Sequence, residues 1–207
     1  MNRTPSTAPT PWSFDPVAVA HHECDAWIGY YRRDWRLVLR SAVGMVRAGF
    51  AMPWSATLRG AWWVLRGNQV WAPYPDNHPD AARRYMRRFY RLVARAHRLR
   101  LDPVEAARLE VAWWHEHRVL QRERTDDDEG PLVTALAELY AYVYDRPSAV
   151  MQAAARDRAL AMRISDQWVA DGCDPADDRL REERHLLIRS YTELLDAVTA
   201  PPAAPGR

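Results

Sequence analysis

An acid and an imidazole that share a helical face with tryptophans are the residues of this chain best placed to do chemistry. Three residues of the segment 101–124 fall within about 60° of Glu110 at 100° per residue: Trp113, Trp114 and His117. The two indoles mark this face as the buried one, so Glu110 and His117 are predicted to point inward. Such groups can hold each other by hydrogen bonds, orient a ligand or bind a metal.

Aromatic residues elsewhere in the chain supply further walls for a pocket. Ten tryptophans in 207 residues favour a rigid aromatic interior. The predicted pocket is lined by Trp27, Tyr31, Trp62, Trp113, Trp114, Glu110 and His117. The first hypothesis is therefore a Trp-rich interior pocket that binds a small ligand or a protein partner, with Glu110 and His117 orienting it.

A second hypothesis uses the same inward groups as metal ligands. Asp157 lies on the apolar stripe of its helix, and so does His21, whereas the adjacent His22 and Glu23 do not. If the helices alternate up and down, Glu110 reaches the level of Asp157 and His117 that of His21. The set His21, Glu110, His117 and Asp157 is typical of iron or manganese in a helical bundle, or of a haem pocket, and would make an oxidase or oxygenase.

Several other kinds of site are excluded or discounted. All 29 basic residues are arginines, which rules out a Schiff-base or P-loop lysine, and no G-x-G-x-x-G or G-x-S-x-G occurs. Glu182 and His185 have the E-x-x-H spacing of di-iron bundles, but they lie more than about 120° from the apolar stripe of their helix. We expect both on the surface.

Start and stop signals place these residues on helices. Asp15-Pro16 and Asp102-Pro103 combine a capping aspartate with a proline at the first helical position. The first helix is predicted from 15, with an apolar stripe that runs to Val38 and an end or bend near Gly44 to Gly49. Further helices are predicted over 53–67, 79–99 and 101–124, and after Pro131, Ser148 and Asp174. The sequence thus predicts an all-α fold, a single-domain antiparallel bundle of about seven helices over 14–199 between disordered tails at 1–13 and 200–207.

Charge, hydropathy and cysteine content limit the kinds of partner and the cellular compartment that we expect for this protein. The net charge of +2 makes a nucleic-acid partner unexpected. No apolar run reaches the roughly 18 residues of a membrane span, and the N-terminal segment is not typical of a secretory signal. Cys24 and Cys173 stand alone, as reduced thiols of a cytoplasmic protein do.

Two segments could contact anionic surfaces. Residues 43–74 hold four tryptophans and three arginines, which fits a peripheral membrane patch, a pocket lid or a core edged by arginines. The segment 79–99 lines one helical face with arginines that include Arg84, Arg88 and Arg91. The third hypothesis is that this face contacts phosphate groups. The alternative is that the arginines form an ordinary solvated surface.

Overall fold

The computed structural model describes residues 13–122 and 128–201, and this part of the chain is helical throughout, without a strand. Its elements are α1 (Pro16–Tyr31), α2 (Trp35–Phe50), α3 (Trp54–Trp71), α4 (Pro79–His97), α5 (Pro103–Arg122), α6 (Gly130–Tyr144), a 3₁₀ turn η1 (Ser148–Met151), α7 (Gln152–Ala170) and α8 (Arg179–Thr199). The predicted all-α bundle is confirmed. Residues 1–12 and 202–207, which hold most of the predicted tails, lie outside the described residues.

The first predicted helix is in fact two helices. α1 ends at Tyr31, Arg33 takes a left-handed φ of 59°, and α2 begins at Trp35. The carboxylate of Asp34 accepts hydrogen bonds from the backbone N–H groups of Arg36 and Leu37, both at 3.1 Å, and so caps the new helix. The apolar residues keep a helical spacing from the end of α1 into α2, although the chain turns between the two helices. The sequence pattern therefore did not reveal the break.

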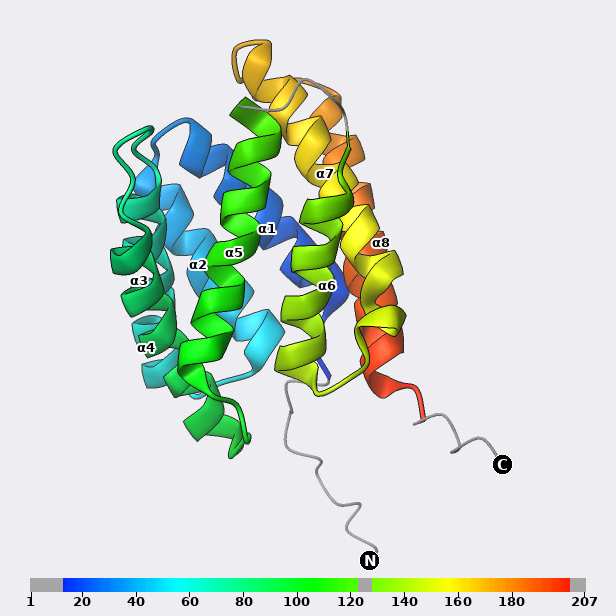
Figure 1. Cartoon of the computed structure of the whole chain (residues 1–207). Coiled ribbons are helices and arrows are strands. Elements are labelled where there is room, and N and C mark those ends of the chain that lie inside the picture. The colour runs from blue at the N-terminus through cyan, green and yellow to red at the C-terminus, as the bar shows by residue number, and fades with distance from the viewer. Residues whose placement is uncertain (1–12, 123–127, 202–207) are drawn as a thin grey trace, which may run out of the picture.

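Each helix packs against the next one in the chain, and α8 packs back against α1 (Figure 1). The eight helices thus close a ring. In Figure 1, α2, α3 and α4 form one side and α6, α7 and α8 the other, with α1 behind and α5 in front between them. One continuous cluster of buried side chains draws on all eight helices. Because the helices surround the middle of the ring, the space there can be filled only by their inward-pointing side chains.

The inward face of α3 differs from the prediction. Trp62 was expected inside, but it is 47% exposed, and Trp54 and Leu58 on the same side of the helix are 60% and 54% exposed. Besides Leu65 and Trp71, the helix buries a face of mostly small residues: Thr57, Gly60, Ala61, Val64 and Gly67. A Cβ at Gly60 would already lie 3.3 Å from the ring of Phe89 on α4. Close packing of α3 on α4 therefore favours small side chains there and turns the large ones outward.

Two other predictions of helical phase are confirmed. On α4, Met86, Phe89 and Val93 are buried while the arginines lie on the opposite, exposed face. On α8, Glu182 and His185 are both exposed. No helix within the described residues has the length and hydropathy to cross a membrane, as the sequence led us to expect.

Gly29 and Gly49 give a matched test of how α1 and α2 pack. A Cβ at Gly29 would lie 3.0 Å from the backbone nitrogen of Val38 and 3.1 Å from the carbonyl oxygen of Asp34. At Gly49 it would meet only Val19, at an ordinary 3.6 Å. We expect Gly29→Ala to lower the free energy of unfolding by about 1–3 kcal/mol through overpacking. Gly49→Ala should raise it by up to about 1 kcal/mol through helix propensity.

Urea unfolding of the two variants measures both changes. If Gly29→Ala were as stable as Gly49→Ala, the close approach of the two helices would be contradicted.

Candidate ligand-binding cavity

A cavity of about 210 Å³ lies at the centre of the ring, and all eight α-helices contribute to its wall. It exceeds the roughly 150 Å³ of an engineered apolar cavity that takes benzene, so a small organic molecule has room in it. Six of the seven residues predicted for a pocket line it: Trp27, Tyr31, Trp113, Trp114, Glu110 and His117. The prediction for Trp62 is wrong, because this side chain is exposed on the outer side of α3.

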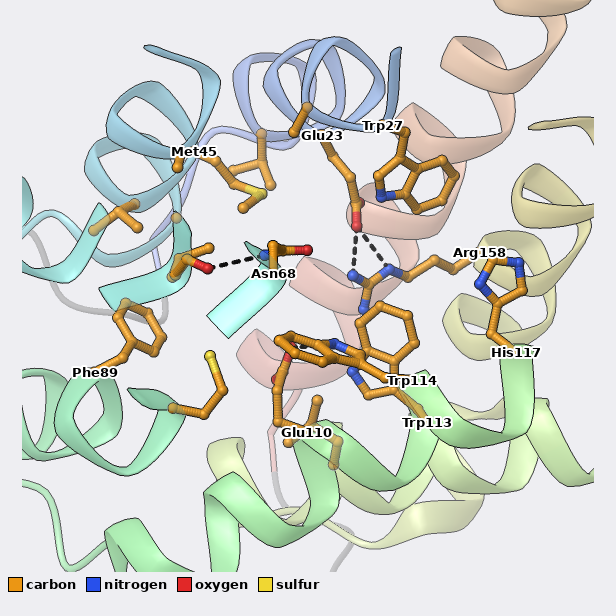
Figure 2. Close-up of a pocket in the computed structure, with 18 of the residues that line it drawn as sticks. Glu23, Trp27, Met45, Asn68, Phe89, Glu110, Trp113, Trp114, His117 and Arg158 are labelled. Carbon is orange, nitrogen blue, oxygen red and sulfur yellow. Dashed lines mark hydrogen bonds and ion pairs between the residues drawn. The ribbon is translucent and has the colours of Figure 1, made fainter. Parts of the chain in front are cut away.

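A buried ion pair crosses one end of the cavity (Figure 2). Glu23 of α1 accepts hydrogen bonds from Nε of Arg158 on α7, at 3.1 Å, and from its Nη2. The Glu23 and Arg158 side chains are only 3% and 10% exposed. The hydroxyl of Tyr191 donates to the second oxygen of Glu23 at 2.5 Å, and Nη1 of Arg158 donates to the Tyr140 hydroxyl at 3.1 Å. Both charges are thus satisfied without water.

The surroundings keep Arg158 charged. Burial by itself would lower the pKa of Arg158, but Glu23, Tyr140, Tyr191 and Glu110 together outweigh burial and raise this pKa well above its usual range. The guanidinium carbon also lies 4.7 Å from the centroid of the Trp113 ring, a distance at which a cation is attracted by an aromatic face. The cavity end therefore carries a fixed pair of opposite charges.

Glu110 forms a second polar group in the wall, as predicted from its phase on α5. Its carboxylate accepts from the Tyr90 hydroxyl at 2.5 Å and from the indole N–H of Trp114 at 3.2 Å. Burial raises the pKa of Glu110, while these two hydrogen bonds and the charge of Arg158 oppose the rise. Glu110 is held in one orientation by its neighbours.

Aromatic rings make up much of the remaining wall. The rings of Trp71 and Trp114 lie 5.9 Å apart, and those of Trp113 and Trp114 6.1 Å apart and nearly perpendicular. On the opposite side, Phe50 and Phe89 make an edge contact at 5.3 Å. Rings that hold one another in this way form a rigid surface on which a flat apolar molecule can stack.

Asn68 is a lining residue that the sequence analysis missed. Its amide nitrogen donates to the carbonyl oxygen of Val64 at 3.0 Å, one turn earlier on α3. Figure 2 shows the amide oxygen directed into the open centre, toward the side where Glu23 lies. This oxygen can accept a hydrogen bond from a molecule in the cavity.

A polar cluster borders the cavity near the C-terminal end of α5. His117 Nε2 lies 3.0 Å from one oxygen of Asp166 on α7, and both side chains are less than one-fifth exposed. The other oxygen of Asp166 accepts from Gln121 at 2.6 Å, and Gln121 also reaches the hydroxyl of Tyr31 at 3.1 Å. His117 is inward as predicted, and its partner is a carboxylate that the sequence did not single out.

The four predicted metal ligands are not brought together. His21 is exposed, and Asp157 forms an ion pair with Arg189 of α8. The expected meetings of Glu110 with Asp157 and of His117 with His21 are therefore wrong. Within 13–122 and 128–201, no three His, Cys, Asp or Glu side chains are grouped so that they could hold a metal ion.

Glu23 and Arg158 escaped prediction for different reasons. The phase of α1 was set by an apolar stripe that ran on to Val38, beyond the true end of the helix, and this tilted the predicted inward face toward His21 and away from Glu23. Arg158 did carry a signal. It lies among the buried residues Ala154, Ala155, Ala159, Ala161 and Met162, where an exposed arginine would be out of place.

Comparison with protein-family models, with curated proteins and with solved structures gives no match to this chain.

α8 buries another carboxylate outside the cavity wall. Glu183 is fully buried, and neither of its oxygens has a hydrogen-bond partner among the described residues. Burial raises the pKa of Glu183 to about 8, and the charge of Glu23 adds to the rise, while Cys24 and Arg184 lower it. At neutral pH this side chain is therefore largely protonated.

The ion pair gives a direct test of what holds α7 to α1. Arg158→Met leaves the Glu23 carboxylate buried without its partner, which should cost about 3–5 kcal/mol of unfolding free energy. The double variant Glu23→Gln/Arg158→Met should regain part of this loss, because no charge is then stranded. As a matched control, Arg184→Met breaks the half-exposed pair with Asp25 and should cost at most about 1 kcal/mol.

Chemical denaturation of the three variants gives the comparison. A double variant no more stable than Arg158→Met would show that the stranded charge is not the cause of the loss.

Glu183 predicts a specific dependence of stability on pH. A carboxylate whose pKa is raised by folding stabilises the fold below its unfolded value of 4.5, and this contribution is lost as the pH rises to about 8. The free energy of unfolding should fall across that range. Glu183→Gln should flatten the slope and be the more stable protein at about pH 9. Urea unfolding at several pH values measures this, and the exposed neighbour variant Glu182→Gln should keep the slope of the parent.

Proposed function

We propose that the protein binds a small, neutral and largely aromatic molecule in its central cavity. The observation that carries the proposal is the cavity itself, about 210 Å³ of space that is lined by residues of α1 to α8 and faced with indole and phenyl rings. Pockets of this kind, mostly apolar with a few fixed polar groups, are where proteins hold small ligands.

The state of the polar groups favours a neutral ligand. Glu23 and Arg158 neutralise each other, and each oxygen of Glu23 already accepts a hydrogen bond. Both oxygens of Glu110 also have donors, in Tyr90 and Trp114. Arg118 also lines the cavity, and its guanidinium is held by the Tyr30 hydroxyl at 3.0 Å and over the rings of Trp71 and Tyr74. A charged ligand would find no free carboxylate and would lose its hydration on entry.

The Asn68 amide oxygen favours a ligand with a hydrogen-bond donor. A hydroxyl or ring N–H on an aromatic molecule could bond to it while the ring lies against Trp114. The ligand class we propose is therefore an aromatic or alicyclic ring with one donor. The oxidase alternative lacks a ligand set, because its four predicted metal ligands lie apart.

We also propose that the protein resides in a reducing compartment, the cytoplasm. Cys24 and Cys173 are both free thiols, and Cys24 is buried against α8, where its Sγ lies 3.9 Å from the carbonyl oxygen of Leu180. Free buried thiols are typical of cytoplasmic proteins.

Thermal unfolding with a series of small aromatic compounds tests the proposal. We expect compounds of the size of indole to raise the melting temperature by mass action. Ala42→Phe should abolish the shift by filling the cavity, since Ala42 is a buried lining residue. Trp62→Ser, on the outer surface, should leave the shift unchanged.

The hydrogen bond is tested by comparing indole with 1-methylindole. Asn68→Leu should weaken indole binding by up to about tenfold and leave 1-methylindole unaffected. Circular dichroism checks that each variant keeps its helices. A shift that survives in Ala42→Phe would contradict binding in the cavity.

A further inference from the structure

The outer surface of α3 carries a row of three large apolar side chains. Trp54, Leu58 and Trp62 are 60%, 54% and 47% exposed, and their spacing of four residues aligns them along one side of the helix. Single exposed apolar residues are ordinary, but a continuous row of this size marks a contact surface. The cavity proposal does not account for this row.

Charge is distributed very unevenly along the chain. Residues 35–100 hold thirteen arginines and two aspartates, a formal net charge of +11, although the whole chain carries only +2. The remaining residues therefore carry a net charge of −9. Because α2, α3 and α4 lie side by side (Figure 1), the positive charge is gathered on one side of the ring.

Arginines border the apolar row from both neighbouring helices. The guanidinium carbon of Arg47 on α2 lies 5.0 Å from the centroid of the Trp54 ring. On the other side, the guanidinium carbon of Arg88 on α4 lies 4.8 Å from the ring of Trp63, the residue after Trp62. The indoles and the arginines are therefore parts of one surface, which we call the basic face.

Most arginines of α4 are free to meet an external anion. Arg84, Arg87, Arg91 and Arg95 are all exposed. In the part of the chain that the structure describes, Arg83 with Asp80 is the one ion pair that an arginine of α4 makes. An excess of unpaired positive charge on one face calls for a partner that carries many negative charges.

We propose that the basic face binds the surface of a membrane that contains anionic lipids. Trp54, Leu58 and Trp62 would enter the boundary between headgroups and acyl chains, where indoles are favoured, and the arginines would contact lipid phosphates. Each arginine near an anionic bilayer adds to the binding, and apolar insertion supplies the second signal needed for stable attachment.

The alternatives fit this face less well. A nucleic acid would match the arginines but would leave the outward row of apolar side chains in contact with a polyanion. A second copy using the same face would bring two strongly positive surfaces together. An anionic bilayer offers both negative charge and an apolar layer deep enough to take the leucine as well as the indoles.

Co-sedimentation with phosphatidylcholine vesicles, with and without phosphatidylglycerol, tests the proposal. We expect binding only to the anionic vesicles, and weaker binding as salt is added. Trp54→Ser/Trp62→Ser and Arg87→Glu/Arg91→Glu should each reduce binding by at least about tenfold. The matched controls Leu160→Ser on α7 and Arg181→Glu on α8 make the same kinds of change on other exposed positions and should bind as the parent does.

Circular dichroism checks that each variant is folded, and none of the substituted residues lines the cavity. Three results would overturn the proposal: equal binding to neutral vesicles, loss of binding in the controls as large as in the basic-face variants, or binding to duplex DNA with none to vesicles. A concentration-dependent dimer that Leu58→Ser abolishes, without vesicle binding, would also overturn it.

Discussion

The contact between Glu23 and Arg158 is the interaction on which the rest of the molecule depends. It joins α1 to α7 across the interior, and through Tyr140 and Tyr191 it draws in α6 and α8 as well. Two opposite charges far from water are tolerable only when each is paired and fully hydrogen-bonded, so the helices that carry them can dock in few other ways. The same pair leaves one end of the cavity polar but uncharged in sum, which sets the kind of molecule that can lie there.

α3 connects the interior with the outer surface. It buries a narrow face of small residues against α4, and this close packing brings Asn68 and Trp71 to the cavity wall. The large residues Trp54, Leu58 and Trp62 are then forced outward. The orientation of α3 about its own axis therefore produces both the inner lining and the exposed apolar row. If α3 were rotated so that Trp54, Leu58 and Trp62 pointed inward, the protein would have neither.

Local sequence signals predicted much of this architecture. Asp15-Pro16 and the prolines at 79, 103 and 131 each begin a helix within one or two residues of the expected position. The phases of α4 and α5 followed from their patterns because charged and apolar residues are sharply segregated on the first, and because Trp113 and Trp114 together define an inward direction on the second. Glu110 and His117 followed from that phase without knowledge of their partners.

The sequence by itself therefore determined the all-helical class, most helix starts and the inward side of α5. Those properties depend on backbone hydrogen bonds and on side chains within a few residues of one another. Only the tertiary structure decided that Glu23 rather than His21 faces the centre, that Trp62 faces out, and that Asp157 and Asp166 have different partners. A buried charge is stable only beside its partner, and the partner of Glu23 lies 135 residues away in the chain, where no local pattern can reveal it.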